Sequence, residues 1–412
     1  MKRPGQFHIL ALEGPDAYAC AGGISSRVSG LAKALAEAGH ETHLWFIGDA
    51  ELPDCEQQGL LTLHRWCQWI SAHHRGGVYD GEEGKVRDYA ASLPPFLFGH
   101  CLSPQLASGG QAVVLAEEWH TVDAVLHLHW LLERARLRDR VTLFWNANNT
   151  FGFDRIDWKK LERAATITTV SRYMKHRMWA WGVDPVVIPN GLDAESFAEP
   201  DPNGVAEIRR RFDDHIVLAK VARWDPDKRW LLAVDTVAEL KRTGARPVLI
   251  ARGGVEAHEG EVMGRARAAG LSITHRPSGE SGIAGLVGAL SSLNGADVVV
   301  LQSRLDAKAR AVLFHAADAV LANSGHEPFG LVGLEAMAAG GLACTGASGE
   351  DYAIDGHNAL VLQQNDPREF VSLFTRMRKQ PHGDRPLRTS GMRTARDYAW
   401  PRVLDRALLP RI

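Results

Sequence analysis

Three features that would place a protein in a special class are scarce or missing in this chain. The five cysteines (Cys20, Cys55, Cys67, Cys101 and Cys344) show no C-x2-C spacing, so we expect free thiols in a reducing compartment, not a disulfide framework or a zinc site. The formal net charge is only -2, which gives no reason to expect a nucleic-acid partner. No apolar run approaches the ~20 residues that span a bilayer. The start, MKRPGQFHILALEG, is interpreted as a first strand rather than a signal peptide, and we expect a cytoplasmic protein.

What the chain does have is length and a repeated alternation of elements. Its 412 residues are too many for one ordinary core and predict two domains. Strand FHILALEG, helix ISSRVSGLAKALAEAGH and strand ETHLWFIG form the first unit of an alternation that restarts after AEPDPNGVAEIRRRF. We predict an α/β protein with two doubly wound, Rossmann-like domains, residues 1–195 and 196–395, which face one another across a cleft. Among the helices we expect one over 285–293.

Two carboxylates stand in NSGHEPFGLVGLEAMAAGG, a stretch otherwise rich in Gly, Ala and apolar residues. The apolar spacing from Leu331 onward predicts a helix that begins at Phe329-Gly330, with Glu327 just before it and Glu335 about a turn inside it. A helix N-terminus attracts phosphate, and a carboxylate can accept hydrogen bonds from two neighbouring sugar hydroxyls. The pattern therefore favours a nucleotide sugar as the ligand. The alternative is that Glu327 caps the helix and Glu335 is a solvated surface residue.

Cations for the phosphate are available in LAKVARWDPDKRW. Arg223 ends an expected strand and Lys228 follows in the next loop, so both could reach a diphosphate at the strand ends. The alternative is a solvated turn. The same loop contains Asp225 and Asp227, a D-x-D string that could hold a divalent metal beside a diphosphate. We expect no metal requirement, because Asp-Pro-Asp is ordinary turn chemistry and the basic residues already supply positive charge.

These motifs resemble those of a known family. EPFGLVGLEAMAAG, preceded by AVLANS and followed by GASGEDYAIDGHNALVL, is similar to the donor-site signature of the retaining, glycogen-synthase-like GT-B glycosyltransferases of family 4. VIPNGLD, VARWDPDK, AGGISSRVSGLAKALAEAGHETHLW, TVSRYM and EEWHT resemble further family segments in the same order. The resemblance covers nearly the whole chain and implies the GT-B fold, with an acceptor-binding first domain and a nucleotide-sugar-binding second domain.

The resemblance implies roles for the residues that match the family's motifs. Glu327 would bind hydroxyls of the donor sugar, and Glu335 would bind the nucleotide ribose. Arg223 and Lys228 would bind the diphosphate. Backbone N–H groups of one segment would contact the sugar and diphosphate, and two glycines would line the cleft from the first domain, where a side chain would block close approach. These donor-binding residues are Phe329, Gly330, Leu331, Val332, Gly22 and Gly23.

One position departs from the family's pattern. Many members have a His after the strand that corresponds to VTLFW, near the reacting sugar carbon, whereas this chain has Asn146 in NANNTFGF. An Asn can hydrogen-bond a sugar but cannot relay a proton at neutral pH. His120 in EEWHT is the nearest His with a family counterpart, and it could bind donor or acceptor. The alternative is a structural histidine. The Asn- and aromatic-rich segment FWNANNTFGFDRIDW is interpreted as a sugar-binding loop.

The implied activity is a retaining transfer of a hexosyl group from a nucleoside diphosphate sugar, UDP- or GDP-sugar favoured, to a hydroxyl of a glycan, lipid-linked or small-molecule acceptor. No cofactor is expected. A sugar-nucleotide epimerase on the same fold and a non-catalytic sugar-nucleotide-binding protein are the alternatives. A phosphorylase is disfavoured because no motif for a pyridoxal-bearing lysine is found.

Two further segments carry expectations. The family's last helix returns to the first domain, and TARDYAWPRVLDRALL over 394–409 resembles it, with Trp400 as the anchoring aromatic residue; residues 396–412 should therefore pack on the first domain. SRYMKHRMWAWG combines basic and aromatic residues on an expected helix, which suits peripheral contact with an anionic membrane. The alternative is an ordinary half-exposed helix.

Overall fold

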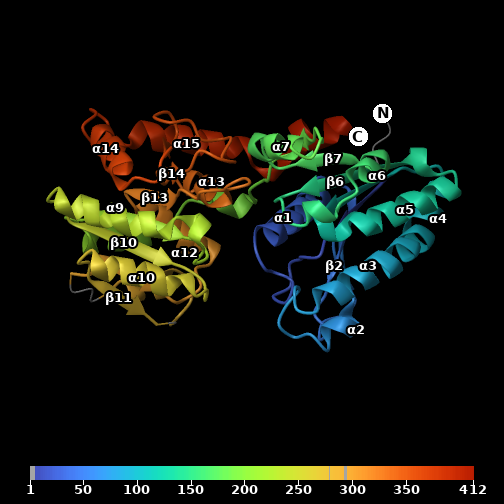
Figure 1. Ribbon diagram of the computed structural model, residues 1–412, viewed down its shortest axis with the longest axis horizontal. Helices are drawn as coiled ribbons and strands as arrows, with labels where there is room; N and C mark the ends of the chain where they lie inside the picture. Colours follow the sequence, from blue (N-terminus) through green and yellow to red (C-terminus); the bar gives the residue numbers. More distant parts are fainter. Residues whose placement is uncertain (1–4, 278, 292–294) are drawn as a thin grey trace. The chain divides into compact units, whose positions relative to one another are not determined.

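The chain divides into two compact units, each with its own sheet (Figure 1). The computed structural model describes residues 5–277, 279–291 and 295–412. Unit 1 consists of Met1–Gly191 with Tyr398–Ile412, and unit 2 of Leu192–Asp397. The predicted boundaries are 195/196 and 395/396. The first four residues of the N-terminal segment interpreted as a strand lie outside the described residues.

The sheet of unit 1 has the order β3-β4-β2-β1-β5-β6-β7-β8, and every neighbouring pair is parallel except β3 with β4. β5 is buried at every position, as expected for an inner parallel strand covered on both faces. The β3–β4 hairpin was not predicted, because the short β3 is mostly exposed and has no apolar alternation. The strands are β1 (Gln6–Leu10), β2 (Glu41–Ile47), β3 (Cys55–Gln58), β4 (Leu61–Trp66), β5 (Ala112–Glu117), β6 (Val141–Ala147), β7 (Thr166–Thr169) and β8 (Val186–Val187).

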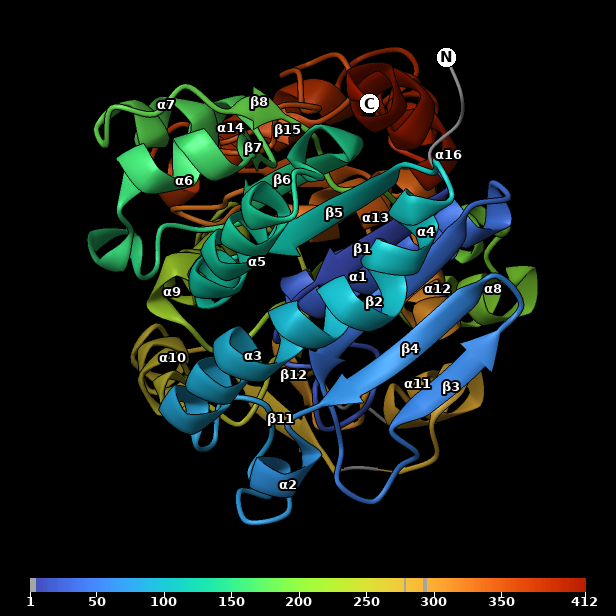
Figure 2. The same ribbon diagram turned by 90° about the vertical axis from the view of Figure 1, so that its right-hand side faces the viewer.

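Helices cover both faces of this sheet. α3 and α5 pack side by side over one face (Figure 2). On the other face, α1 shares a core with Phe7 and Ile9 of β1. The helices of unit 1 are α1 (Gly23–Glu37), α2 (Gln68–Ser71), α3 (Glu82–Phe96), the π-helical η1 (Leu97–Leu102), α4 (Ser103–Ala107), α5 (Val122–Arg134), α6 (Trp158–Ala164), α7 (Arg172–Trp179) and α16 (Trp400–Val403), the π-helical η7 (Leu404–Leu408), and the 3-10 turns η2 (Trp119–Thr121), η3 (Arg138–Arg140), η4 (Phe153–Arg155) and η8 (Leu409–Arg411).

The C-terminal segment differs from the expected single helix over 394–409. One helix, α15, ends at Asp397, and α16 begins at Trp400. Pro401 lies in the first turn of α16, where a missing N–H is tolerated but through which a longer helix could not continue. The Trp400 side chain, only 2% exposed, belongs to the core of unit 1. A methyl group at Gly191 would stand 2.3 Å from the Trp400 ring, so the backbone there approaches the indole closely.

The sheet of unit 2 has the order β11-β12-β10-β9-β13-β14-β15 and is parallel throughout its described strands. The helix expected over 285–293 is α11, which ends at Ala289; the last two residues of that prediction lie outside the described residues. The strands are β9 (Ile216–Val221), β10 (Pro247–Arg252), β11 (Ile273–Arg276), β12 (Val298–Leu301), β13 (Ala319–Ala322), β14 (Ala343–Thr345) and β15 (Leu360–Val361). The helices are α8 (Pro202–Arg211), α9 (Trp230–Arg242), α10 (His258–Ala268), α11 (Gly282–Ala289), α12 (Ala307–Ala316), α13 (Leu331–Ala338), α14 (Pro367–Arg378) and α15 (Arg385–Asp397), with the 3-10 turns η5 (Ala194–Phe197) and η6 (Pro226–Lys228).

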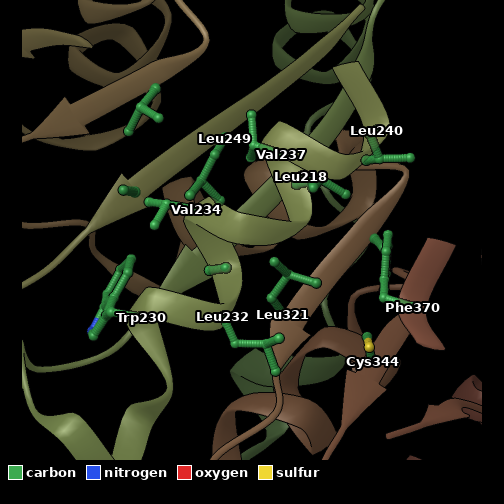
Figure 3. Packing of buried hydrophobic residues seen from close by; sticks show 14 of the residues in the cluster. Leu218, Trp230, Leu232, Val234, Val237, Leu240, Leu249, Leu321, Cys344 and Phe370 are labelled. Atoms are coloured by element: carbon green, nitrogen blue, oxygen red, sulfur yellow. The ribbon is translucent and has the colours of Figure 1, made fainter. Parts of the chain in front are cut away.

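The core of unit 2 lies between α9 and the sheet. Figure 3 shows Val234 and Val237 of α9 facing Leu218 of β9 and Leu249 of β10. These side chains are almost completely buried, so the transfer of their apolar surface out of water stabilises the layer. The same packing fixes where β9 and its neighbour β13 end.

Each sheet reverses its strand order at one place. In unit 2 the chain runs from β9 to β10 on one side, whereas β13 pairs with β9 on the other side. In unit 1 the equivalent reversal lies between β1 and β5. Loops that leave the carboxyl ends of strands at such a reversal diverge and form the usual ligand crevice of open α/β sheets.

Candidate functional site

The loops after β9 and β13 bring two of the predicted site residues into direct contact. The Lys228 Nζ lies 2.7 Å from the Glu327 Oε2, and the two side chains are 22% and 19% exposed. The loops are also joined through their backbones, because the Gly325 N–H donates a hydrogen bond to the Asp227 carbonyl at 2.6 Å. The sequence placed these residues 99 positions apart, and the fold makes them one site.

Arg223 and the D-x-D string lie on the same loop after β9. The Arg223 side chain is exposed, and its carbonyl accepts a hydrogen bond from the Trp230 indole at 2.7 Å. Within the described residues its guanidinium forms no ion pair, so it is available to an anion. Asp225 caps the η6 turn by accepting a hydrogen bond from the Asp227 N–H at 2.9 Å. The ordinary turn chemistry predicted for this string is therefore present; metal independence stays a prediction.

The helix after Glu327 begins as the sequence indicates. Gly330 precedes α13 with a φ of 84°, a left-handed conformation that only glycine adopts readily. Phe329 is buried, whereas Leu331 and Val332 in the first turn are partly exposed. The Tyr352 hydroxyl donates to the Gly330 carbonyl. The first N–H groups of α13 therefore have a fixed direction at the strand-order reversal, which suits them to bind an anion.

Glu335 lies in the second turn of α13 and has a partner that the sequence did not reveal. The Arg310 guanidinium of α12 lies 3.2 Å from the Glu335 carboxylate. The Glu335 side chain is 22% exposed, so it is neither fully buried nor the solvated residue of the alternative interpretation. Burial raises the pKa of Glu335, and the Arg310 charge opposes this effect.

The predicted residues of unit 1 gather around the other strand-order reversal. Gly22 precedes α1 and Gly23 begins it, and a methyl group at either would meet nothing within 4 Å among the described residues beyond its own chain neighbours. The Glu13 carboxylate, which follows β1, accepts hydrogen bonds from the Gly22 and Ser25 N–H groups at 3.1 and 3.0 Å, and from Tyr79. Packing within the chain therefore does not require these two glycines, and space beside them is open.

Asn146, at the end of β6, is locked into a buried network. Its amide nitrogen donates to Glu117 at 2.8 Å, and its amide oxygen accepts from Thr168 at 2.9 Å. The Glu117 carboxylate is in turn paired with the Arg27 guanidinium at 3.0 Å and accepts from Asn148 at 2.7 Å. Both polar atoms of the Asn146 amide thus have partners inside the chain, and the side chain is only 3% exposed, so this network holds it in place.

His120 lies in η2, directly after β5. Its Nε2 is 2.7 Å from a Glu82 carboxylate oxygen, and its ring stacks on Trp119. Burial lowers the pKa of His120 against the raising effect of Glu82, which favours the neutral imidazole. Just before it, Glu118 has a φ of 68°, and burial raises the pKa of the Glu118 carboxyl to about 8. A strained backbone beside a buried acid is a feature that functional sites often share.

The family of the chain follows from two sequence models that match its two halves. Residues 21–196 match "Glycosyltransferase Family 4", and residues 206–391 match "Glycosyl transferases group 1". The chain is a glycosyltransferase of this family. The first match lies almost entirely in unit 1 and the second lies in unit 2, and together the two matches include every predicted site residue.

Named relatives of this glycosyltransferase agree with the assignment. A D-inositol 3-phosphate glycosyltransferase of Stackebrandtia nassauensis is 26% identical over 97% of the chain and 88% of the relative. A protein of the same name from Thermomonospora curvata is 30% identical, but the match covers only 34% of the chain and 33% of that relative. The catalytic domain of starch synthase IV from Arabidopsis thaliana, solved with ADP and acarbose, has a TM-score of 0.67 at 16% identity and covers 98% of this chain and 100% of that one. The predicted GT-B fold is therefore confirmed.

In the glycosyltransferase a further carboxyl group that the sequence did not single out lies beside Glu327. Glu350 follows β14, is 5% exposed, and accepts hydrogen bonds from the Ser348 N–H and hydroxyl at 3.1 and 3.2 Å. Ser348 in turn accepts a hydrogen bond from the Glu327 N–H at 3.0 Å. The motif GASGEDYAIDG contains Ser348 and Glu350, but its spacing does not show that the Glu350 side chain is buried and the neighbouring Asp351 is less so.

The segment of the glycosyltransferase proposed for membrane contact is partly engaged. On α7 and just after it, Trp179 and Trp181 are 54% and 42% exposed. However, Lys175 is paired with Asp184 at 2.9 Å, and the Trp179 indole donates to the same carboxylate at 2.7 Å. Among the described helices, none is both long and apolar enough to cross a bilayer. Peripheral membrane contact stays a prediction.

Proposed function

We propose that the protein is a retaining hexosyltransferase whose donor, a nucleoside diphosphate sugar, binds to unit 2 between the loops after β9 and β13. The observation that carries this proposal is the contact of Lys228 with Glu327 at 2.7 Å beside the N-terminus of α13. The cation and the row of helix N–H groups could bind the phosphates of such a donor. The carboxylate could accept hydrogen bonds from its hydroxyl groups.

The diphosphate would lie between the basic residues and the helix. Lys228 and Arg223 supply positive charge, and the first turn of α13 supplies directed N–H groups. Because negative charge grows on the diphosphate as the C1–O bond breaks, these groups would stabilise the transition state more than the bound substrate. No metal or other cofactor is needed in this proposal.

The hydroxyl groups at the two ends of the donor would be held by the two carboxylates. Glu327 would accept from hydroxyls of the sugar, and Glu335 from hydroxyls of the ribose. The backbone from Phe329 to Val332 would contact the sugar and the phosphates between them. Glu327 is paired with Lys228, and Glu335 is paired with Arg310. Donor binding would replace these ion pairs with contacts between the donor and the same side chains.

The transfer step would keep the configuration of the sugar. The C1–O bond breaks with oxocarbenium character. The acceptor hydroxyl would enter on the face that the diphosphate leaves, and a diphosphate oxygen would take its proton. The chain supports this route over a protein base because Asn146, at the position where many relatives have His, cannot accept a proton at neutral pH.

The acceptor would bind to unit 1, near Gly22, Gly23 and His120. The open space at the two glycines and the neutral His120 suit a polyhydroxylated acceptor. The relatives' name makes inositol 3-phosphate the first acceptor to test, with glycans, lipid-linked sugars and small sugars after it. UDP- and GDP-sugars are the donors we favour.

A donor panel tests the proposal. The chain is incubated with UDP-, GDP- and ADP-sugars, with and without acceptors, and nucleotide release and the anomeric form of the product are followed. We expect release that depends on an acceptor and a product with the donor's anomeric configuration. Isomerised donor without an acceptor would identify an epimerase, and donor binding without any release would identify a non-catalytic protein; an inverted product would refute the retaining mechanism.

A further inference from the structure

Glu350 presents a buried carboxyl group with one oxygen unused. Its Oε2 accepts both hydrogen bonds from Ser348, whereas its Oε1 has no hydrogen-bond partner among the described residues. Leaving a buried polar atom unpaired is costly, and it costs far more if the carboxyl group is ionised. The chain therefore tolerates Glu350 at this place for a reason other than stability.

The contacts of Glu350 lead directly to the loop that positions Glu327. Ser348 donates to Glu350 through its hydroxyl and accepts from the Glu327 N–H with the same oxygen atom. The adjacent Gly349 N–H donates to the Glu327 carbonyl at 2.8 Å. On the other side, a methyl group at Gly330 would stand 2.6 Å from the Glu350 Cγ and 3.3 Å from the Glu327 Cγ. Glu350 thus contacts the start of α13 and the support of Glu327 together.

The charges around Glu350 oppose its ionisation. Burial is the main cause that raises the pKa of Glu350 to about 7, and the Glu327 charge is the next largest cause. The Lys228 charge is already paired with Glu327. Burial also lowers the pKa of Lys220 to about 7. The Lys220 ammonium donates a hydrogen bond to the Asn323 side chain, which follows β13. The titratable and charged groups on the segments packed here include Lys220, Asp225, Asp227, Lys228, Arg229, His326, Glu327, Cys344, Asp351 and Tyr352.

We propose that Glu350 is a positioning residue for donor binding that supports the site only while it carries a proton. In either form Glu350 accepts the hydrogen bonds from Ser348, but only the protonated form adds no second negative charge next to Glu327. Ionised, it repels both the Glu327 carboxylate and the donor diphosphate across a poorly solvated space, so the affinity for donor falls as the pH rises through neutrality. This inference rests on the proposed donor site in unit 2.

The test compares the pH dependence of donor affinity in the wild-type chain and in Glu350→Gln. Glutamine keeps the shape of the protonated acid and cannot ionise. UDP-, GDP- and ADP-glucose serve as probes, because a diphosphate esterified at both ends does not titrate near neutral pH. Between pH 6 and pH 9 we expect the wild-type affinity to fall about tenfold more than that of Glu350→Gln, with nearly equal affinities at pH 6. Titration of Lys220 is common to both proteins and cancels in this comparison.

Two further variants separate positioning from mere folding. Asp351→Asn removes a neighbouring carboxylate from the same loop and should keep the wild-type pH profile. Ser348→Ala removes the bridge to Glu327 and should weaken binding at both pH values. Parallel profiles for the wild type and Glu350→Gln would overturn the inference while leaving the donor site intact. If no probe binds the wild-type chain at either pH, the proposed function itself fails and this inference fails with it.

Discussion

At the scale of single residues, the proposed donor site contains charges that neutralise one another before any ligand arrives. Lys228 and Glu327 form a partly exposed ion pair at 2.7 Å. Such pairs contribute little to folding, because the attraction is offset by lost hydration and side-chain entropy. Their place beside the N-terminus of α13 is better explained by binding than by stability.

Replacing either partner should therefore separate activity from stability. We expect Lys228→Met and Glu327→Gln to lower kcat/KM by about 100-fold or more, because each removes a charge that stabilises the departing diphosphate or orients the sugar. The free energy of unfolding should change by less than about 1 kcal/mol. Steady-state kinetics and urea denaturation measure both quantities.

A matched control lies in the same unit. Lys241 pairs with Asp297 at 2.8 Å, which resembles the Lys228 pair in geometry but not in location. Lys241→Met should leave kcat/KM within about twofold of wild type. Near-normal turnover in Lys228→Met or Glu327→Gln would contradict the assignment of the donor site.

The sequence predicted the residues that lie in its motifs and missed their partners. Glu327, Glu335, Arg223 and Lys228 stand in recognisable spacings, so the sequence could indicate their chemistry. Arg310, Ser348 and Glu350 take part only because separate loops and helices meet in the fold. For Asn146 the departure from the family was visible in the sequence, whereas the buried network that uses its amide was not.

At the scale of elements, the start of α13 is the feature on which the proposed donor site would depend most. Gly330 has a left-handed backbone, and the Glu350 and Glu327 side chains flank the place where a Cβ would stand. Glycine is thus required twice, for conformation and for space. The direction of the first N–H groups of α13 follows from this one residue.

Gly330→Ala should damage both folding and binding. We expect a loss of about 1–3 kcal/mol in the free energy of unfolding, from the strained conformation and the displaced carboxyl side chains, and a loss of donor affinity of about tenfold or more. Gly356→Ala is the control, because Gly356 also has a positive φ of 68° but a Cβ there would meet nothing within 4 Å. It should cost some stability and no affinity; equal losses of affinity in the two variants would refute the role given to α13.

The most apolar and buried strands were predictable from this sequence, whereas the exposed and irregular elements were not. β12 is apolar and buried throughout, and β5 is buried throughout and apolar up to Glu117 at its end, so both stand out in the sequence. The exposed β3 has no such signal. The π-helical η1 follows Pro94 and Pro95 inside α3, where proline removes N–H donors and disturbs the ordinary helical bonding, a rearrangement that apolar spacing does not encode.

At the scale of the whole molecule, each unit has its own core, and unit 1 is built from two separate stretches of the chain. The last fifteen residues, Tyr398–Ile412, belong to unit 1 although unit 2 precedes them. Trp400 packs in one cluster with Val28, Leu31 and Phe46. The stability of unit 1 therefore depends on residues that follow unit 2 in the chain.

Trp400→Ala should destabilise unit 1 selectively. Removing a fully packed indole costs about 3–5 kcal/mol. We expect hydrogen exchange to speed up in α1, β1 and the C-terminal segment, whereas the exchange of β9, β10 and β13 in unit 2 should stay close to wild type. Uniform acceleration in both units would contradict the division of the chain into two separate cores.

The central claim is that the nucleotide of the donor binds to unit 2 through Glu335 and the N-terminus of α13. Calorimetric titration of UDP, GDP and ADP into the wild-type chain and into Glu335→Ala tests it most directly. We predict that at least one nucleotide binds the wild type and that its Kd rises about tenfold or more in the variant, because the ribose hydroxyls lose their acceptor. An unchanged Kd in Glu335→Ala, or no binding of any of the three nucleotides to the wild type, would contradict the claim.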